Sequence, residues 1–295
     1  MSAPARKASY LVGLIGSGIG GSFSPALHKH EADRHGLRYI YRLIDLDRIG
    51  AEPRRVGELL KAAHGMGFRG LNITHPCKQL VIDHLDELSP QAEATGAVNT
   101  VVFEDGSGGG RAVGHNTDVT GFAAFYDCEL TDVPRDRVVQ LGCGGAGAAV
   151  AHALLGAGSG HLTVVDPLTD RAVALADSLN KRFGEGRSSA TTPDGLPPLL
   201  SRADGLVHAS PTGTAARPGL PLPADLLHPG LWVVDIVYRP LETELLHTAR
   251  ARGCVTKNGV GMVVFQAADA FQLFTGRKPD RERMLAHAAE LDSSE

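Results

Sequence analysis

The sequence predicts an α/β protein built from two domains. Strand-like and helix-like stretches alternate along its 295 residues, a pattern typical of mostly parallel sheets covered by helices. A glycine-rich fingerprint opens the second half of the chain. Polar side chains gather where buried strands end, which is where α/β sheets bind ligands. We therefore expect a mostly parallel α/β substrate domain followed by a Rossmann-type, doubly wound nucleotide-binding domain.

The first block should contribute residues 1–117. Short apolar or alternating runs predict its strands, and amphipathic stretches predict its helices. The strands are expected at 10–15, 38–44, 70–74, 98–103 and 111–114, and the helices at 25–36, 53–66 and 77–88. A glycine-rich turn at 105–110 makes the last two strands a hairpin.

The second block should run over residues 118–261. Its strands are expected at 137–141, 161–165, 205–209 and 231–236, and its helices at 120–127, 145–156 and 168–183. A closing helix at about 262–275 is apolar almost all round, which predicts that it is buried. Proline and glycine crowd residues 193–198 and 211–229, which we interpret as loops.

Composition excludes several classes of protein. The net charge of −4 offers no basic surplus for nucleic acid. No apolar run reaches transmembrane length, and residues 1–10 lack the apolar core of a signal peptide, so we expect a cytoplasmic protein without a membrane partner. The four cysteines form no C-x-x-C pair and no H-x-x-x-H occurs, so we expect no metal site.

The glycine fingerprint at residues 142–147 has the layout of a dinucleotide site. A strand precedes it, a helix follows, and the next strand ends at Asp166, 24 residues beyond Gly142. Such glycines let a pyrophosphate approach the helix N-terminus, and the acidic residue can hold the ribose hydroxyls. A carboxylate at Asp166 favours NAD over NADP. Arg171 remains open between a phosphate contact, stacking on the adenine and a solvated charge.

A second match, at residues 16–21, lies in a longer loop. Ser24 and Pro25 follow it as the expected N-cap and first residue of a helix. The hydroxyls of Ser22 and Ser24 would suit a substrate carboxylate beside the helix N-terminus. The alternative for Ser24 is a plain helix cap.

Lysine and aspartate supply a candidate catalytic pair. Asn72 and Thr74 lie at the end of a buried strand, and we expect Pro76 to start the next helix with Lys78 in its first turn. The positive end of that helix would disfavour the charged amine. Asp118 falls at the passage between the two blocks, where a substrate cleft is expected. An ordinary surface lysine and a helix N-cap are the respective alternatives.

Taken together, these motifs resemble the shikimate dehydrogenase family, including its quinate/shikimate branch. The resemblance spans nearly the whole chain in order. It rests on Ser22-Phe23-Ser24-Pro25, Asn72-Ile73-Thr74-His75-Pro76-Cys77-Lys78, Ala97-Val98-Asn99-Thr100, Asn116-Thr117-Asp118, Gly142-Cys143-Gly144-Gly145-Ala146, Asp235-Ile236-Val237-Tyr238 with Pro240 and Thr243, and Gly259 through Gln266-Ala267.

The resemblance implies a role for each matching position. Lys78 and Asp118 would be the catalytic pair. The substrate would be held by Ser22, Ser24, Asn72, Thr74, Asn99, Tyr238 and Gln266. The cofactor would contact Gly142, Gly144, Gly145, Ala146, Asp166, Arg171, Ile236 and Gly259. Because the family's closing helix returns to the first domain, residues 262–295 would complete that domain.

Two departures from the family pattern point to its NAD-using quinate/shikimate branch. Asp166-Pro167-Leu168-Thr169 stands where the NADP enzymes usually carry Asn-Arg-Thr/Ser, and Val119 replaces a glycine. We expect NAD-dependent oxidation of a cyclitol carboxylate, shikimate or quinate, to its ketone. Ser24, where some members of that branch have threonine, leaves the choice between them open.

Several alternatives remain open at this point. They are a biosynthetic NADP enzyme that reduces 3-dehydroshikimate, an amino-substituted cyclohexane acid as substrate, another two-domain dehydrogenase and a non-catalytic dinucleotide sensor. The sequence does not give the oligomeric state, and a homodimer stays open.

Overall fold

The computed structural model describes residues 8–104 and 110–292. The chain divides into two compact units, residues 1–117 with 264–295 and residues 118–263. The first unit is therefore discontinuous in sequence.

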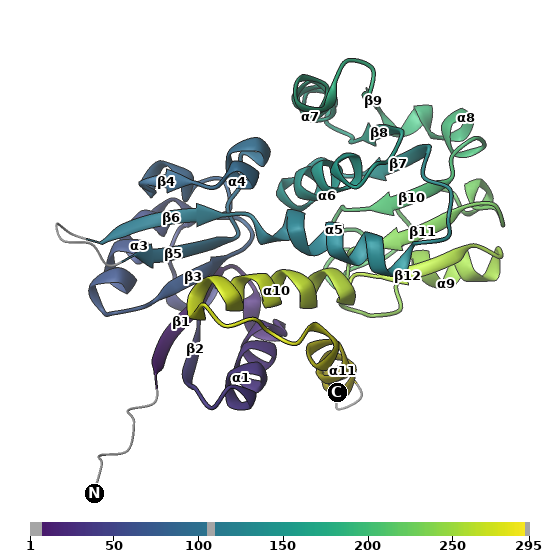
Figure 1. Ribbon diagram of the computed structural model, residues 1–295. Coiled ribbons are helices and arrows are strands. Elements are labelled where there is room, and N and C mark those ends of the chain that lie inside the picture. The colour runs from purple at the N-terminus through teal and green to yellow at the C-terminus, as the bar shows by residue number, and fades with distance from the viewer. Residues whose placement is uncertain (1–7, 105–109, 293–295) are drawn as a thin grey trace, which may run out of the picture. The chain divides into compact units, whose positions relative to one another are not determined.

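The first unit is built on a mixed sheet (Figure 1). Within the described residues, its strand order is β2-β1-β3-β5-β6-β4. β1 pairs in parallel with β2 and β3, whereas β5 is antiparallel to β3 and β6. The strands are β1 (Ser9–Gly16), β2 (Arg38–Asp45), β3 (Gly70–Ile73), β4 (Glu87–Leu88), β5 (Thr100–Glu104) and β6 (Arg111–His115). The helices are α1 (Ser24–Arg34), α2 (Leu46–Ile49), α3 (Val56–Gly65), α4 (Pro90–Thr95), α10 (Val260–Thr275), which begins in the second unit, and α11 (Arg281–Asp292).

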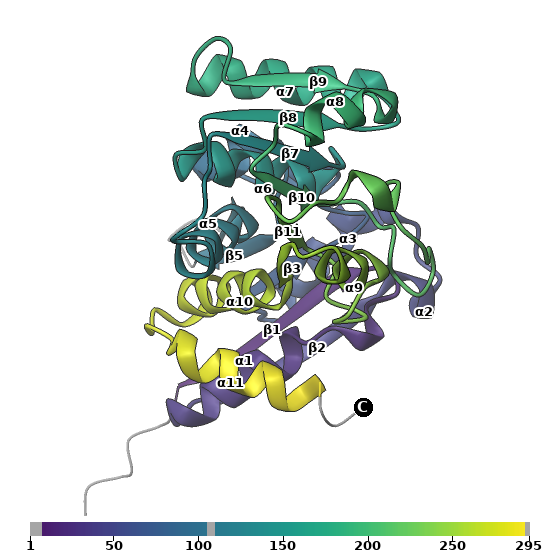
Figure 2. The same ribbon diagram turned by 90° about the vertical axis from the view of Figure 1, so that its right-hand side faces the viewer.

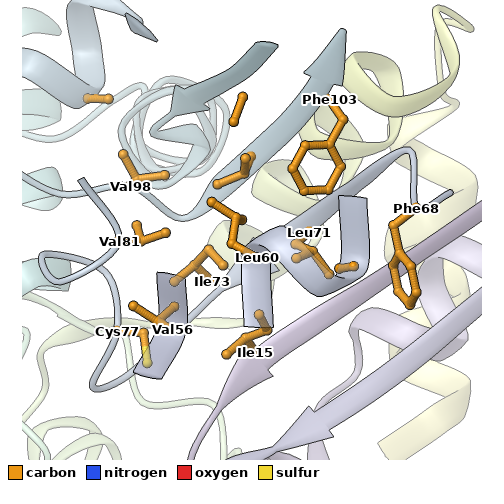
Figure 3. Close-up of a cluster of buried hydrophobic side chains, with 14 of the residues drawn as sticks. Ile15, Val56, Leu60, Phe68, Leu71, Ile73, Cys77, Val81, Val98 and Phe103 are labelled. Carbon is orange, nitrogen blue, oxygen red and sulfur yellow. The ribbon is translucent and has the colours of Figure 1, made fainter. Parts of the chain in front are cut away.

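Apolar residues bury both faces of this sheet. On one face Val56 and Leu60 of α3 pack with Leu71 and Ile73 of β3, in the cluster drawn in Figure 3. On the other face Ala270 and Phe274 of α10 join Val12, Leu14 and Val102. The C-terminal segment returns to this unit because one sheet face would otherwise expose its apolar side chains to water.

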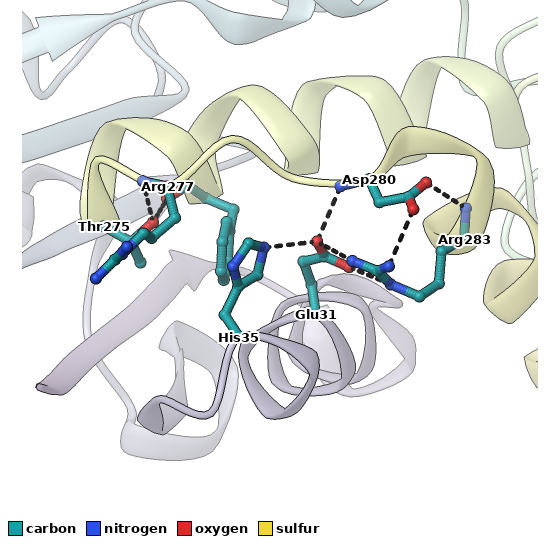
Figure 4. Close-up of polar contacts among 7 residues, drawn as sticks. Glu31, His35, Thr275, Arg277, Asp280 and Arg283 are labelled. Atoms are coloured by element: carbon teal, nitrogen blue, oxygen red, sulfur yellow. Dashed lines mark hydrogen bonds and ion pairs between the residues drawn. The ribbon is translucent and has the colours of Figure 1, made fainter. Parts of the chain in front are cut away.

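A buried carboxylate attaches α11 to α1, which lie side by side (Figure 2). Glu31 of α1 has no exposed surface. It accepts hydrogen bonds from Arg283 Nη2 at 2.7 Å and from the Asp280 N–H at 2.9 Å. It is also paired with the His35 ring (Figure 4). A charge buried this deeply is stable only with such partners, so this network fixes where the C-terminal helix docks.

The second unit carries an all-parallel sheet. Its order is β12-β11-β10-β7-β8-β9 within the described residues, the doubly wound order typical of dinucleotide-binding domains. The strands are β7 (Arg137–Leu141), β8 (His161–Val165), β9 (Ser188–Thr191), β10 (Gly205–His208), β11 (Trp232–Asp235) and β12 (Val255–Asn258). The helices are α5 (Thr117–Glu129), which starts in the first unit, α6 (Gly145–Gly156), α7 (Thr169–Phe183), α8 (Leu196–Leu200) and α9 (Glu244–Ala251).

The predicted helix at 77–88 is wrong. The structure has turns there, then a short 3₁₀ helix (Ile82–His84) and β4. Because the Lys78 carbonyl accepts a hydrogen bond from the Val98 N–H at 2.8 Å, it is tied to the segment before β5 rather than to a following turn of helix.

Other elements differ from the expectation in smaller ways. The predicted loop at 193–198 instead contains a 3₁₀ turn and the start of α8. Sequence patterns led to no expectation for α4, β9, α9 or β12, each of which has at most eight residues. The hairpin of β5 and β6 is confirmed, although positions 105–109 of its predicted turn lie outside the described residues. Across the described chain, no helix is long and apolar enough to span a bilayer.

Candidate active site

Sheet topology brings the predicted polar motifs of the first unit to one edge. β1 and β3 end at this edge in parallel, with Ile15 opposite Ile73. β5 runs the other way and therefore begins here, with Thr100 opposite Asn72. β6 ends here in turn, with His115 opposite Thr100. The loops that carry the serine, lysine, asparagine and aspartate motifs all leave the sheet on this side.

A buried hydrogen-bond network fixes the two predicted asparagines. Asn72 accepts from the Tyr41 hydroxyl at 2.8 Å and donates to Thr100 Oγ1 at 3.0 Å. Asn99 accepts from the Thr117 N–H at 2.7 Å, and its amide donates to Thr117 Oγ1 at 2.9 Å. Such a satisfied network holds its members rigid, so both amides are preorganised at the sheet edge.

Lys78 and Asp118 are attached to the same short segment. The backbone of Lys78 receives the Val98 N–H, while Asp118 directly follows Thr117, which is bonded to Asn99. Lys78 is half-buried and Asp118 is buried. Since no helix begins at Pro76, the expected effect of a helix dipole on Lys78 does not apply. Asp118 is the second residue of α5, so it is not the helix N-cap either.

The serine loop is held by a carboxylate. Asp45, at the end of β2, accepts from the N–H groups of Gly18 and Ile19, both at 3.2 Å. The Ser22 hydroxyl accepts from the Ser24 N–H at 3.2 Å. The expected capping role of Ser24 is wrong: Ser24 is already helical and the residue at the cap is Phe23, because the helix starts one residue earlier.

Thr74 follows β3 directly. Its N–H donates to the Ile15 carbonyl at 2.9 Å, and its methyl group lies where a Cβ on Gly16 would stand, 2.3 Å away. The close approach of the two loops requires glycine at that position. It places Thr74 beside the start of the serine loop.

The glycine loop of the second unit fits a dinucleotide. Gly142 has φ of +98°, and a Cβ on Gly147 would stand 2.2 Å from the Gly142 carbonyl oxygen, so both glycines are required by the turn itself. Gly144 is different: it is exposed, and a Cβ there would meet no protein atom within 4 Å. Gly144 leaves open space in front of the N-terminus of α6, where Gly145 and Ala146 begin the helix. That space beside backbone donors is what a pyrophosphate needs.

Asp166 is anchored to this loop. Its buried carboxylate accepts from the Cys143 N–H and from the Leu168 N–H, both at 2.9 Å. Burial, and then the Asp166 charge, raise the pKa of the Cys143 thiol to about 12, while the charge of Arg171 acts in the opposite direction. The thiol therefore stays neutral, and the exposed Arg171 lies close enough to influence the loop electrostatically.

The remaining predicted cofactor positions lie next to one another. A Cβ on Gly259 would stand 2.3 Å from the Ile236 carbonyl oxygen, so the chain after β12 packs on the chain after β11. Tyr238 follows two residues later and is half-buried. Gln266 lies in the part of α10 that belongs to the first unit.

Sequence reasoning missed several supporting residues. Tyr41 and Thr100 orient Asn72, and Asp45 holds the serine loop. An acidic residue at a strand end is a weak signal that could have indicated Asp45. Hydrogen bonds between residues 31 positions apart, such as Tyr41 to Asn72, have no local signal. No cluster of metal-ligating side chains occurs in the ranges that the structure describes.

Comparison with known proteins agrees with this arrangement. Residues 14–101 match the family model of the shikimate dehydrogenase substrate binding domain, and residues 259–288 match the shikimate 5'-dehydrogenase C-terminal domain. The chain is 71% identical to a protein of Streptomyces avermitilis named shikimate dehydrogenase (NADP(+)), over 96% of each chain. It is 48% identical to a protein of Corynebacterium efficiens named quinate/shikimate dehydrogenase (NAD(+)), over 94% of this chain and 97% of the other.

Solved structures give the same result. Quinate dehydrogenase from Corynebacterium glutamicum in complex with NAD has a TM-score of 0.89 at 44% identity, over 96% of this chain and all of that one. Shikimate 5-dehydrogenase from Thermus thermophilus in complex with NADP(H) and shikimate has a TM-score of 0.81 at 34% identity, over 96% and 99% of the two chains. Together with the glycine loop and the polar sheet edge, these similarities show that the chain belongs to the shikimate dehydrogenase family, NAD(P)-dependent oxidoreductases that act on CH–OH groups.

Proposed function

We propose that this enzyme oxidises the ring alcohol of shikimate, quinate or both with NAD as the preferred dinucleotide. The observation that carries the cofactor preference is the Asp166 carboxylate, which is bonded to the glycine loop itself through the Cys143 N–H. A carboxylate fixed there can accept hydrogen bonds from ribose hydroxyls and repels a 2′-phosphate. The Corynebacterium relatives named for NAD support the same assignment.

In the proposed mechanism, Lys78 and Asp118 manage the proton. Oxidation removes a hydride from the carbinol carbon and a proton from its oxygen, and the bound dinucleotide supplies the hydride acceptor. As hydride leaves, the carbinol oxygen becomes more acidic, and the neutral amine of Lys78 accepts its proton. Asp118 orients the amine and binds a ring hydroxyl. In the opposite direction the Lys78 ammonium donates that proton.

The other polar residues of the first unit position the substrate. The hydroxyls of Ser22 and Ser24, at the start of α1, would hold the carboxylate group. Asn72, Thr74 and Asn99 would bind ring hydroxyls. Because the network through Tyr41, Thr100 and Thr117 already fixes the two amides, their ordering cost is met before substrate binds.

The remaining proposed contacts come from loops and from α10. Tyr238 and Gln266 would complete the substrate contacts, and Ile236 and Gly259 would lie at the nicotinamide. The small cyclitol carboxylate is the only partner that this proposal requires.

A second candidate is NADP-dependent reduction of 3-dehydroshikimate. The 71% identity to the Streptomyces avermitilis protein named for NADP favours it. On this alternative Arg171, rather than Asp166, would decide the cofactor by pairing with the 2′-phosphate.

A four-way assay separates the two candidates. Purified enzyme is assayed with shikimate and with quinate, each with NAD and with NADP, and kcat/KM is measured for all four combinations. We expect kcat/KM with NAD to exceed kcat/KM with NADP at least 10-fold for whichever acid is used. A higher kcat/KM with NADP would establish the second candidate, and no turnover with either acid would refute both.

A further inference from the structure

A serine, a histidine and an aspartate form a hydrogen-bonded chain in the second unit. His208 Nδ1 lies 2.9 Å from Asp235 Oδ1, and His208 Nε2 lies 2.6 Å from Ser210 Oγ. His208 and Asp235 are completely buried, at 0% exposure, whereas Ser210 is half-buried. None of these three residues has a role in the mechanism above.

The hydrogen-bond partners of Asp235 determine which ring nitrogen of His208 carries a hydrogen. Its carboxylate also accepts from the Val237 N–H at 3.0 Å and from Thr243 Oγ1 at 2.7 Å. A carboxylate surrounded by donors requires His208 to carry its hydrogen on Nδ1. Nε2 is then an acceptor. It takes the hydrogen of the Ser210 hydroxyl, because it lies 2.6 Å from Ser210 Oγ whereas the other acceptor, Thr212 Oγ1, lies 3.3 Å away. Ser210 Oγ accepts from the Thr212 N–H at 3.3 Å and keeps a second lone pair for another donor.

These residues lie at the topological switch point of the sheet. β7 and β10 are neighbours there, and their following loops bound the crevice in which doubly wound sheets bind nucleotides. A Cβ on Gly142 would stand 2.7 Å from the Ala209 carbonyl oxygen and 2.9 Å from the Ser210 nitrogen. The Ile236 N–H donates to the His208 carbonyl at 3.0 Å. The segment 208–210 therefore packs against the glycine loop at Gly142 and is bonded to the chain at Ile236, next to the proposed nicotinamide position.

We propose that His208, held by Asp235, is a positioning residue for the dinucleotide that acts through Ser210. By taking the Ser210 hydrogen, it presents the serine oxygen as an acceptor to a donor on the nicotinamide half of the cofactor. That donor is either a ribose hydroxyl or the carboxamide NH₂ group. This inference rests on the dinucleotide site proposed above, but not on the choice between NAD and NADP.

The same geometry could suggest a nucleophilic serine of the Ser-His-Asp type. The local backbone argues against that role. Nucleophilic attack needs N–H donors for the developing oxyanion. Pro211 has no N–H, and the Thr212 N–H donates to Ser210 Oγ itself at 3.3 Å. Positioning of a ligand is therefore the better supported role.

Direct titration of the full-length enzyme with NADH and with NADPH tests the proposal. We expect Ser210→Ala to weaken binding of the preferred dinucleotide about 5-fold, the effect of one net hydrogen bond of about 1 kcal/mol. We expect His208→Ala to weaken it equally, with KM for the acid substrate unchanged. The double variant should bind within 2-fold of either single variant, because His208 acts only through Ser210. Ser210→Thr, which keeps the hydroxyl, should retain affinity.

His152→Ala is the matched control. His152 is also buried in this unit, and its ring nitrogens have no hydrogen-bond partner within the described residues, so dinucleotide affinity should not change. If His208→Ala does not fold, His208→Asn replaces it: the shorter amide can still contact Asp235 but cannot reach Ser210. Thermal unfolding of each variant confirms that it is folded.

An analogue distinguishes the two ligand groups. The 3-acetylpyridine analogue of the dinucleotide lacks the carboxamide NH₂. If that group is the donor, Ser210→Ala will not weaken binding of the analogue; if a ribose hydroxyl is the donor, the 5-fold loss will persist. Either outcome supports the proposal.

Three results would overturn it. They are unchanged dinucleotide affinity in Ser210→Ala, losses that add in the double variant, and covalent labelling of Ser210 by a fluorophosphonate, which would show a nucleophile instead. Wild-type enzyme that binds neither dinucleotide would refute the proposed function rather than this inference.

Discussion

Replacing Asp166 should change which dinucleotide the enzyme prefers. In Asp166→Ala the carboxylate that contacts the glycine loop is removed, and the N–H groups of Cys143 and Leu168 lose their acceptor. NAD loses a charged acceptor for its ribose hydroxyls, which costs about 1.5 kcal/mol. NADP loses a repulsion: one negative charge and a doubly charged phosphate at roughly 5 Å repel by about 1.7 kcal/mol even in bulk water.

Together these effects amount to about 3 kcal/mol, or on the order of 100-fold in the ratio of kcat/KM for NAD to that for NADP. The assay is initial-rate kinetics with both dinucleotides at saturating acid substrate. Asp170→Ala is the control, because Asp170 is an exposed carboxylate in the first turn of α7. It should change the ratio less than 2-fold. A change below 5-fold in Asp166→Ala, or wild-type enzyme that already prefers NADP, would refute the reasoning.

Three further predictions follow from the first unit. Lys78→Ala should lower kcat at least 100-fold with a smaller change in KM, the usual loss for a general acid–base group, whereas Lys61→Ala, at an exposed position of α3, should be active. Near-normal turnover of the Lys78 variant would refute the proposed base. Burial lowers the pKa of His28 to about 3, so only the unfolded state binds a proton there, and the free energy of unfolding should fall as pH drops below 6.5, by up to about 1.4 kcal/mol per pH unit. In urea unfolding between pH 6.5 and 4, His28→Phe should reduce this slope, and an identical slope would contradict the assignment. Arg283→Ala should lower the free energy of unfolding in denaturant by roughly 3 kcal/mol, because it leaves the buried Glu31 carboxylate without its main partner. A decrease below 0.5 kcal/mol would show that water solvates Glu31.

Local sequence determined the glycine loop and the strands around it. The turn at residues 142–147 needs glycine for reasons that lie within a few residues, a positive φ at Gly142 and the contact of Gly147 with the Gly142 carbonyl. Asp166 could be found because it directly follows the next strand, β8, at a regular spacing from the glycines. Periodicity likewise predicted α3 and α7, since each of these helices has an apolar face of its own.

The surroundings of Lys78 could not be predicted in this way. Local sequence favoured a helix after Pro76, but the Lys78 carbonyl is bonded to Val98, 20 residues away. Because no helix forms there, no helix dipole acts on Lys78. The feature that positions this residue is its hydrogen bond to the segment before β5. The partners of Asn72 were hidden for the same reason, because Tyr41 and Thr100 reach it only through strand pairing.

The sequence by itself thus determined the two α/β sheets, the dinucleotide loop and the residue types that the chemistry needs, because each is encoded by spacing within a few turns or one strand. Only the tertiary structure decided which backbone groups hold Lys78, which hydroxyls orient the asparagines, and that His208 meets Asp235 beneath Ser210. Hydrogen bonds across a sheet join residues whose separation along the chain carries no periodic signal, so they exist only once the strands have paired.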